Sequence, residues 1–328
     1  MSNIRIRTIG RLAGTLLAAA LVLSLAACGR PTESALRIGT NVWIGSEPLY
    51  LARELGRLDN AAVQLVEYPS ASEVLRAYRN QAIDGMVISL DELFGLAAEG
   101  FEPRIVVVVD VSHGADVVVG RAGMRTMRDL KGKSVAVESS ALGAFVLSRA
   151  LALNDMQAGD VRIVHLESNE QVSAYEKGLV DGAVTFDPYT AKFAQAGAAT
   201  LFDSTWIPGE IVDVIAVRDT MFERKPKAIR ALLTGWFGAL DYMKSDPMDA
   251  ARRMGIRQQT TGEAFLQAQK GLHIPTRDEN LRMLGGPSPE LVVTGQRLKS
   301  LMIESKLLRS DVDIARVLAP GPLADLPR

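Results

Sequence analysis

The sequence predicts an α/β protein of two lobes, each a mostly parallel sheet flanked by helices. From Leu36 onward, short apolar runs alternate with amphipathic runs, which is the pattern of repeated strand and helix units. The chain has 328 residues, more than one hydrophobic core usually serves. The alternation comes in two series, and the second begins after Arg121. We therefore expect one sheet in each lobe.

Residues 1–27 are predicted to be a secretory signal peptide. The first part of this segment contains Arg5, Arg7 and Arg11 and no acidic residue. An apolar stretch from Leu16 to Leu25 follows, and the segment ends in Ala26 and Ala27. This is the three-part layout of such peptides. A membrane-spanning helix is the alternative, but it needs about 20 apolar residues, and the stretch is shorter.

The sequence contains one cysteine, Cys28. The run Leu25-Ala26-Ala27-Cys28 resembles the lipobox of bacterial lipoproteins, in which the cysteine carries acyl chains that hold the protein to a bilayer. The resemblance implies lipidation at Cys28, a tether over residues 28–35 and a location at the cell membrane, facing the periplasm or the cell exterior. An anchoring Cys28 leaves no cysteine for a disulfide, a thiolate nucleophile or a zinc–thiolate site.

The composition excludes several classes of partner. Loss of the signal peptide removes three arginines, so the formal net charge of −1 becomes more negative by three. The remaining chain has no basic domain and no Lys/Arg run, so nucleic-acid binding is not expected. The sequence has no HExxH motif, Cys/His cluster or EF-hand loop. We therefore predict no metal site and no cofactor.

The first lobe is predicted to comprise residues 36–120 and 213–328. Its run Ile105–Val109 is almost purely β-branched, which is typical of a strand covered on both faces. The predicted strands are Leu36–Val42, Val63–Tyr68, Ile83–Ile88 and Ile105–Val111. The predicted helices lie near Leu49–Leu55, Ser72–Arg79 and Asp91–Ala98. The C-terminal third is predicted to be helical, because apolar residues from Ile229 to Met243 fall on one stripe.

The second lobe is predicted over residues 121–212. Its predicted strands are Val135–Val137, Val161–His165 and Ala183–Phe186. Its predicted helices are Leu142–Leu153, Asn169–Gly178 and Tyr189–Gln195. The strand Val212–Val217 then returns the chain to the first lobe near Asp213. Two crossings between lobes make a hinge that can close around a ligand.

Four segments are similar to those of a known family. They are Ile38–Ala52, Asp84–Asp91, Asp129–Val137 and Phe186–Tyr189. Together they resemble the nitrate/sulfonate/taurine/thiamine-pyrimidine family of solute-binding proteins. The resemblance implies a periplasmic-binding-protein-like fold of type II with the ligand in the interlobe cleft. It also implies a monomer without enzyme activity that delivers a small molecule to an ABC permease and its ATPase.

Two other functions fit the same fold. A ligand-presenting module of a membrane sensor would share the cleft and the anchor. Eukaryotic thiamine-pyrimidine synthases resemble this chain in outline, but they carry a cysteine-rich motif and are not exported. Neighbouring genes for a permease and an ATPase would favour transport, whereas an adjacent sensor kinase would favour signalling.

The candidate ligand contacts are residues just past predicted strand ends, because ligands of open α/β sheets bind beyond the carboxyl ends of the strands. Trp43 offers an aromatic face and an N–H donor, and Gly45 allows close backbone approach. The complete set is Asn41, Trp43, Gly45, Ser89, Asp91, Glu138, Ser139, Ser140, Phe186, Asp187 and Asp213.

Several candidates have a structural alternative. Trp43 could be a core residue in a turn, and Asp91 or Asp187 could cap the helix that follows it. The same holds for Ser139 and Ser140, although the free N–H groups of that helix could also hold a polar or anionic ligand group. For Asp213 the alternative is a partnership with nearby backbone.

The acids in this set favour one class of ligand. Asp91, Glu138, Asp187 and Asp213 are expected in the cleft, with Asp116 and Glu210 near, and few basic residues lie at matching strand ends. A buried carboxylate is costly unless it is paired. Trp43, Phe186 and Tyr189 add flat faces suited to a ring. We therefore predict a small heteroaromatic or amine-bearing solute rather than nitrate or an alkanesulfonate.

Overall fold

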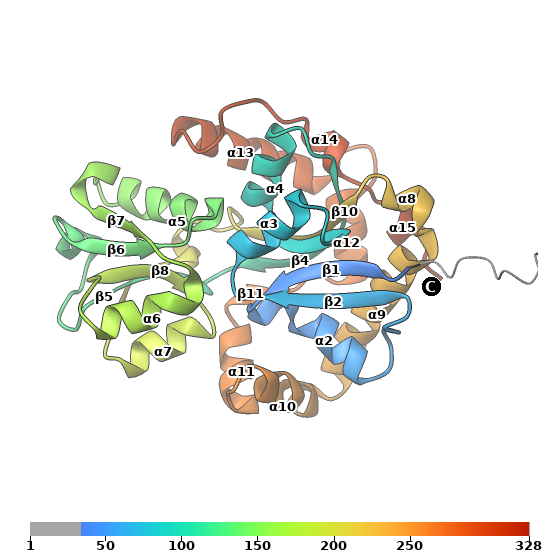
Figure 1. Ribbon diagram of the computed structural model, residues 1–328, viewed down its shortest axis with the longest axis horizontal. Coiled ribbons are helices and arrows are strands. Elements are labelled where there is room, and N and C mark those ends of the chain that lie inside the picture. Colours follow the sequence, from blue (N-terminus) through green and yellow to red (C-terminus); the bar gives the residue numbers. More distant parts are fainter. Residues whose placement is uncertain (1–33, 328) are drawn as a thin grey trace, which may run out of the picture. The chain divides into compact units, whose positions relative to one another are not determined.

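The computed structural model describes residues 34–327, so the predicted signal peptide and Cys28 lie outside the described residues. The chain from Ala35 onward forms one compact unit, which contains two sheets (Figure 1). Within residues 34–327, every helix is too short or too polar to cross a lipid bilayer.

The first sheet is mixed and has the strand order β11-β4-β10-β3-β1-β2. Its strands are β1 (Leu36–Asn41), β2 (Val63–Tyr68), β3 (Gly85–Ser89), β4 (Pro103–Ser112), β10 (Val212–Arg218) and β11 (Leu272–His273). Strand β1 pairs in parallel with β2 and β3, whereas β10 runs antiparallel to both β3 and β4. The start of β10 therefore lies beside the ends of β3 and β4.

The second sheet is also mixed, with the order β7-β6-β8-β5-β9. Its strands are β5 (Asp116–Gly120), β6 (Ser134–Val137), β7 (Arg162–His165), β8 (Gly182–Phe186) and β9 (Ala199–Asp203). Strand β6 is parallel to β7 and β8, and β5 is antiparallel to β8 and β9.

One expectation about the sheets is confirmed and one needs correction. The strands of each sheet are mostly parallel, with β10 and β11 reversed in the first sheet and β5 reversed in the second. A helical crossover is what brings successive strands into the parallel direction. However, β5 belongs to the second sheet, so the chain leaves the first sheet before Asp116 rather than after residue 120.

Helices cover both faces of each sheet (Figure 1). In that view α3 (Ala71–Arg79) and α4 (Leu90–Ala98) lie above the first sheet, and α2 (Glu47–Glu54) and α9 (Pro226–Ser245) lie below it. Beside the second sheet, α5 (Ala141–Ala152) lies above, and α6 (Ser168–Glu176) and α7 (Tyr189–Gln195) lie below.

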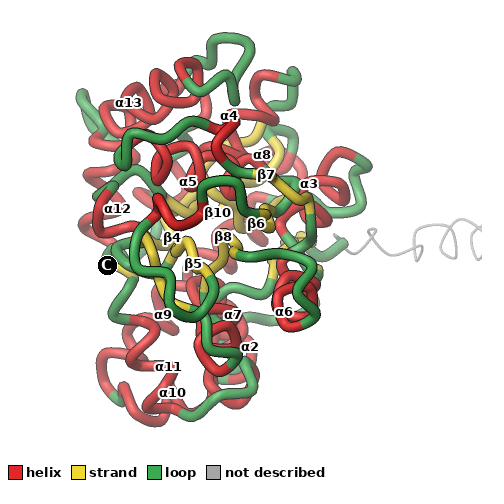
Figure 2. Tube along the Cα trace, turned by 90° about the vertical axis from the view of Figure 1, so that its left-hand side faces the viewer, coloured by secondary structure: helices red, strands yellow, loops and turns green. Residues whose placement is uncertain are grey.

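The C-terminal part of the chain is helical, as the sequence predicts. Helix α10 (Pro247–Arg257) packs against α11 (Gly262–Gln269), and α13 (Glu290–Glu304) packs against α4 (Figure 2). The other helices of this part are α8 (Met221–Arg224), α12 (Arg277–Leu284), α14 (Ile314–Val317) and α15 (Gly321–Ala324). Asp246 caps α10 by accepting a hydrogen bond from the Asp249 amide.

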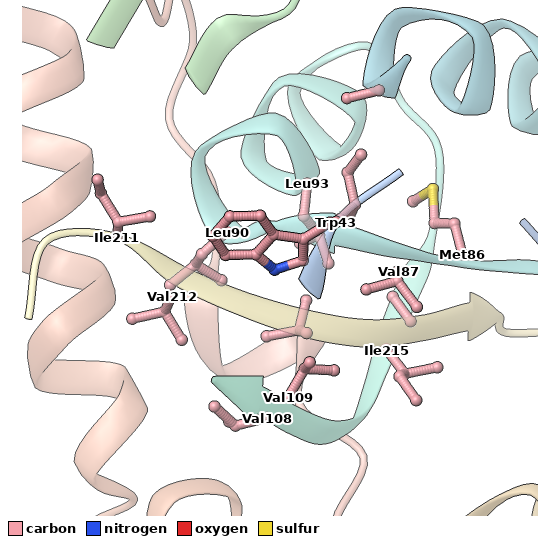
Figure 3. Close-up of a cluster of buried hydrophobic side chains, with 14 of the residues drawn as sticks. Trp43, Met86, Val87, Leu90, Leu93, Val108, Val109, Ile211, Val212 and Ile215 are labelled. Atoms are coloured by element: carbon pink, nitrogen blue, oxygen red, sulfur yellow. The ribbon is translucent and has the colours of Figure 1, made fainter. Parts of the chain in front are cut away.

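The core of the first sheet extends up to Trp43. The run Ile105–Val109 in β4 is completely buried, in agreement with its β-branched composition. Trp43 lies among side chains from β3, β4, α4 and β10 (Figure 3), including Leu90 and Val212. This packing fixes the turn after β1, where candidate ligand contacts are found.

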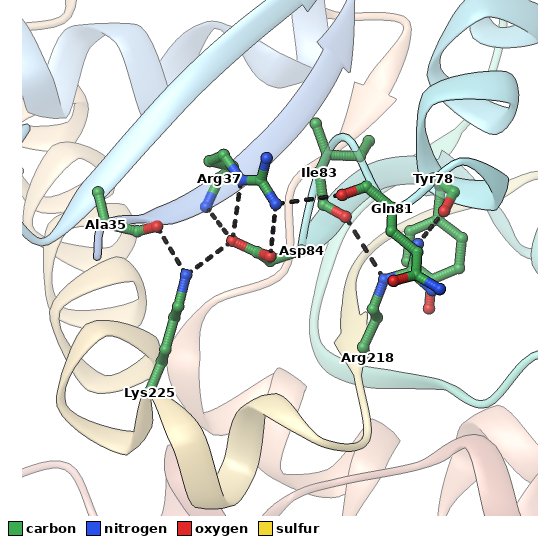
Figure 4. A network of polar contacts seen from close by, with 8 residues as sticks. All are labelled: Ala35, Arg37, Tyr78, Gln81, Ile83, Asp84, Arg218 and Lys225. Atoms are coloured by element: carbon green, nitrogen blue, oxygen red, sulfur yellow. Dashed lines mark hydrogen bonds and ion pairs between the residues drawn. The ribbon is translucent and has the colours of Figure 1, made fainter. Parts of the chain in front are cut away.

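A charged network fixes the amino ends of β1 and β3 (Figure 4). Asp84 accepts hydrogen bonds from the Arg37 backbone N–H at 2.9 Å and from the Lys225 ammonium at 2.9 Å. Burial alone would raise the pKa of Asp84, but these partners hold it below its usual value. The network lies at the opposite strand ends from the candidate contacts and therefore has a structural role.

Candidate functional site

A cavity is lined by residues from both sheets and from the helices that follow their strands. Elements around the first sheet contribute Asn41, Trp43, Ala71, Val87, Ile88, Ser89, Glu92 and Asp213. Elements around the second sheet contribute Asp116, Glu138, Ser140, Leu142, Gly143, Val184 and Phe186. A molecule in this cavity would therefore contact both lobes at once.

Strand register explains why these side chains meet. In the first sheet, Asp213 at the start of β10 lies opposite Ser89 on one side and Asp110 on the other. In the second sheet, Asp116 at the start of β5 lies opposite Phe186 at the end of β8. Because of this antiparallel pairing, the first residues of β5 and β10 lie beside the last residues of the neighbouring strands, at the edge of each sheet where the cavity lies.

Seven of the predicted contacts line the cavity, and four do not. The lining ones are Asn41, Trp43, Ser89, Glu138, Ser140, Phe186 and Asp213. The other four are Gly45, Asp91, Ser139 and Asp187. For these four the structure shows a different environment.

The space beside Gly45 is taken by the protein itself rather than by the cavity. A Cβ atom at this position would overlap Asp110 Oδ2 and Trp43 Nε1. The close approach expected at Gly45 is therefore made by two of the protein's own side chains.

The two helix-start aspartates lie outside the cavity lining. The Asp91 carboxyl group is buried, and its Oδ2 has no hydrogen-bond partner within the described structure. Burial raises the pKa of Asp91 to about 6, and the backbone at the start of α4 opposes this rise. Burial also raises the pKa of Asp187, and the Ala191 backbone of α7 opposes that rise. Ser139 is exposed.

Trp43 is held by two contacts. Its indole N–H donates to Asp110 Oδ2 at 3.2 Å, so the donor expected to face a ligand already has a partner. Its ring meets Phe186 edge-on with centroids 5.3 Å apart, and Phe186 meets Tyr189 in the same way at 5.7 Å. This row of rings brings an aromatic wall from the first lobe to the second.

The cavity is strongly acidic. Glu92, Asp116, Glu138 and Asp213 all line it and are each at most 7% exposed. None of the lining residues within 34–327 is Lys, Arg or His. An anion in this cavity would therefore meet carboxyl groups without a compensating basic side chain.

Burial and mutual repulsion raise the pKa values of these acids. Burial, together with Asp91 and Glu138, raises the pKa of Glu92 to about 8. Burial also raises that of Asp116 to about 7. The pKa of Asp213 lies well above its usual value because of burial and the neighbouring Asp110 and Asp116 carboxyl groups.

Several of these carboxyl oxygens have no protein partner. Glu92 Oε1, Asp110 Oδ1 and Asp116 Oδ2 are buried and accept or donate no hydrogen bond within the described structure. Buried polar atoms are normally paired, because an unpaired one is costly. Two of the three belong to residues that line the cavity, where a ligand could supply the partner.

Glu138 connects the two lobes. Its Oε1 accepts hydrogen bonds from the Ser72 backbone N–H at 2.9 Å and from the Ser72 hydroxyl at 3.2 Å. Its Oε2 accepts from the Ser168 hydroxyl. Since Ser72 lies in α3 and Ser168 in α6, the one carboxylate joins elements of both lobes.

Sequence reasoning missed Glu92, which lines the cavity, and Asp110, which binds the Trp43 indole N–H and lies opposite Asp213. Glu92 stands three residues after Ser89, and this spacing gives a capping box, which the structure contains. Asp110 interrupts the β-branched run of β4, and a lone acid in such a strand is a signal that could have found it. Asp116 was expected only near the cleft, and Glu210, expected near it as well, instead pairs with Arg149 at 2.6 Å.

The acids are not arranged as a metal centre. Within residues 34–327, no group of three or more His, Cys, Asp or Glu side chains is placed to hold a metal ion.

Sequence comparison finds a family and relatives. The model of the NMT1-like family matches residues 29–256. A protein of Escherichia coli (strain K12) named as an aliphatic sulfonates-binding protein is 29% identical over 192 residues, which are 56% of this chain and 59% of that protein. The chain thus aligns with less than two thirds of this relative.

Structure comparison confirms the two-lobe, periplasmic-binding-protein-like fold. The alkanesulfonate-binding protein SsuA from Xanthomonas axonopodis pv. citri, bound to MOPS, is similar with a TM-score of 0.74 and 18% identity, over 90% of this chain and 100% of that chain. The ligand binding component of an ABC-type import system from Staphylococcus aureus gives 0.75 and 14%, over 90% and 99%. The desulfurization enzyme DszB gives 0.63 and 15%, over 88% and 98%.

Proposed function

The chain belongs to the NMT1-like family, and on this premise we propose that it is a solute-binding protein that captures a small molecule between its lobes and delivers it to an ABC permease and its ATPase. The observation that supports this most is the cavity lined from both sheets, with buried carboxyl oxygens that lack a protein partner. A binding protein needs such a cavity and a closing motion, and it needs no reacting group.

We further propose export and lipid anchoring. The basic start, the apolar stretch and the run Leu25–Cys28 support this. An anchor through Cys28 and a tether up to residue 35 would keep the protein next to a membrane permease. A monomer suffices for this task, because both halves of the cavity come from one chain.

For the ligand, we propose a small heteroaromatic or amine-bearing solute rather than nitrate or an alkanesulfonate. The acidic lining and the aromatic row of Trp43, Phe186 and Tyr189 support this choice. Relatives are named for sulfonates, but an anion here would lie among carboxyl groups, which disfavours it.

A sensor module that presents its ligand to a membrane receptor is the second candidate. The two functions share the cavity and differ in the membrane partner. A catalytic function is not proposed, although the fold is shared with an enzyme, because other relatives and neighbours are named as binding proteins.

The experiment that tests the proposal has two steps. Freshly purified protein would be analysed by native mass spectrometry, and any bound molecule would be extracted under denaturing conditions and identified. Small-angle scattering would then compare the radius of gyration with and without that molecule. We expect a bound small molecule and a smaller radius in its presence. A protein that binds no small molecule, or that shows no change at saturation, would contradict the proposal.

A further inference from the structure

The acidic residues that line the cavity differ in how many hydrogen-bond partners the protein provides for their carboxyl oxygens. Glu138 has partners for both oxygens in Ser72 and Ser168. By contrast, Glu92 Oε1 and Asp116 Oδ2 have none, although their residues are only 3% exposed. Both residues line the cavity. Two buried acceptors in the same cavity therefore lack the donors that buried carboxylates normally have.

The missing donors do not come from the protein's own cations. The arginines and lysines of the described chain that pair with buried acids lie elsewhere, such as Lys225 with Asp84 and Arg149 with Glu210. No Lys, Arg or His is among the residues that line the cavity in the described structure. These cations therefore supply no donor to Glu92 Oε1 or Asp116 Oδ2, and a ligand in the cavity can supply one.

The start of α5 is a place where an anion could be stabilised, because it presents free N–H groups and the positive end of the helix dipole. Glu92, however, lines the cavity together with Ser140, the residue before this helix, and Ser140 lowers the pKa of the Glu92 carboxyl group. The dipole thus favours the protein's own carboxylate at this position. A ligand anion would have to displace Glu92 or lie against it.

We infer that the ligand carries a protonated nitrogen with N–H donors, an ammonium or amidinium group, and that Glu92, Asp116 and Asp213 hold this group. The inference rests on the proposed solute-binding function and specifies the ligand's charge. The N–H groups of the cation fill the unpartnered acceptors, and its charge offsets the buried carboxylates. Phe186 and Trp43 form an adjacent aromatic wall, which also suits a cation or a ring bearing one.

The test uses sets of molecules that share a shape and differ in charge. Acetamidinium, acetamide and acetate form one set, and benzamidinium, benzamide and benzoate form another, with benzenesulfonate added. Isothermal titration at about pH 8 measures each affinity on the refolded, ligand-free protein. We expect the amidinium to bind most tightly within at least one set. Tighter binding of an anion, or no preference for the amidinium in either set, overturns the inference.

Substitutions of single residues test which carboxylates bind the cationic group of the ligand. Asp116→Asn and Glu92→Gln each replace a carboxylate with an amide of the same shape, and we expect them to weaken amidinium binding by about 10- to 100-fold. Asp155→Asn is the matched control, because Asp155 is an exposed acid that pairs with Arg128 on the surface. Unchanged amidinium affinity in both cavity variants would overturn the assignment, and thermal unfolding would verify that each variant is folded.

The molecule extracted from the purified protein separates this inference from the proposed function. A bound molecule with a basic nitrogen supports both. A bound anion overturns the cation inference and leaves the solute-binding function standing, whereas the absence of any small-molecule binding counts against both.

Discussion

The Glu138 carboxylate accepts a hydrogen bond of 2.9 Å from the backbone N–H of Ser72, and this bond joins the first turn of α3 to the end of β6. Glu138 also lines the cavity. The bond exists only when the two lobes are close together. A side chain at the cavity wall thus takes part in holding the lobes in the arrangement that encloses a ligand.

Glu138→Ala should therefore weaken closure. We expect ligand affinity to fall by about ten-fold or more, since hydrogen bonds to a charged group contribute about 1.5–3 kcal/mol. The radius of gyration of the liganded protein should also increase. Titration calorimetry and small-angle scattering measure the two effects. Glu176→Ala, at an exposed glutamate of α6, is the control, and equal affinity in the two variants would contradict a role of Glu138 in closure.

Gly45→Ala should displace Trp43, which lines the cavity. The added Cβ overlaps Asp110 Oδ2 and Trp43 Nε1, so the Trp43–Asp110 hydrogen bond has to move. Overpacking of this kind costs about 1–3 kcal/mol, and we expect a lower melting temperature, altered tryptophan fluorescence and weaker ligand binding.

The control for this substitution is Gly95→Ala in α4. No atom lies within 4 Å of a Cβ built at Gly95, and alanine in a helix is more favourable than glycine by about 1 kcal/mol. Gly95→Ala should leave stability equal or slightly higher. If the Gly45→Ala protein is as stable as this control, the turn after β1 can accommodate the added Cβ, which would contradict the prediction.

The sequence predicted most strands because buried strands are continuous apolar runs, such as Ile105–Val109 in β4. It predicted mostly parallel strands but not which strands are reversed, since an apolar run does not indicate which neighbour it pairs with. It also missed β5 (Asp116–Gly120), because its Val-Val-Val run lies only a few residues after the end of β4 and reads as part of the same segment.

For the site, position after a strand end was a useful but incomplete guide. It found Trp43 and Phe186, which do line the cavity. It could not separate Asp91 from Glu92, because the direction of each side chain depends on the first turn of α4, where Glu92 lines the cavity and Asp91 does not. Asp116 lies at the start of a strand and is brought to the site only by antiparallel pairing.

Lys225→Met should lower stability without changing ligand affinity. The Lys225 side chain is 6% exposed and donates to Asp84 at 2.9 Å and to the Ala35 carbonyl at 2.8 Å. Its loss leaves Asp84 with Arg37 as its remaining charged partner. Breaking a buried pair costs about 3–5 kcal/mol, and we expect about half of that here. Chemical denaturation measures the change.

Lys227→Met provides the control, because Lys227 is exposed at the start of α9, two residues after Lys225. Its free energy of unfolding should stay within about 0.5 kcal/mol of the parent value. If the two variants are equally stable, the network shown in Figure 4 makes no net contribution.

Cys28→Ala tests the proposed anchor. Without the thiol no acyl chain can be attached, so the protein should move from the membrane fraction to the soluble fraction or remain as an unprocessed precursor. Metabolic labelling with a fatty acid, followed by fractionation, distinguishes these results. Acylation of the variant to the parent level would exclude Cys28 as the lipidated residue.

The cavity acids predict that the ligand-free protein becomes less stable as the pH rises from about 5 to 8. Burial raises the pKa of Glu92 to about 8 and those of Asp110 and Asp116 to about 7, whereas unfolded carboxyl groups titrate near about 4. Between these values the folded state binds more protons than the unfolded state. The free energy of unfolding therefore falls with increasing pH, by up to about 1.4 kcal/mol per pH unit for each extra proton.

The neighbouring acids act in the same direction. The pKa values of Asp91, Glu138, Asp187 and Asp213 are also raised, in each case first by burial. The pKa of Asp84 is lowered instead, so ionisation of this group stabilises the folded state. That stabilisation is fully present above the unfolded pKa of about 4 and is lost only as the pH falls through the lower pKa of the folded state. It therefore adds little slope between pH 5 and 8.

Denaturation at several pH values measures this slope. Asp116→Asn removes one of the titrating groups, so its slope should be shallower than that of the parent, while Asp155→Asn should leave it unchanged. A bound cation favours the ionised carboxylates, so saturating amidinium should reduce the loss of stability at high pH, and its affinity should increase from pH 5 to 8. A stability that rises over this range in the ligand-free protein would show that the carboxyl groups are already ionised and paired, and would remove the physical basis of the pH dependence.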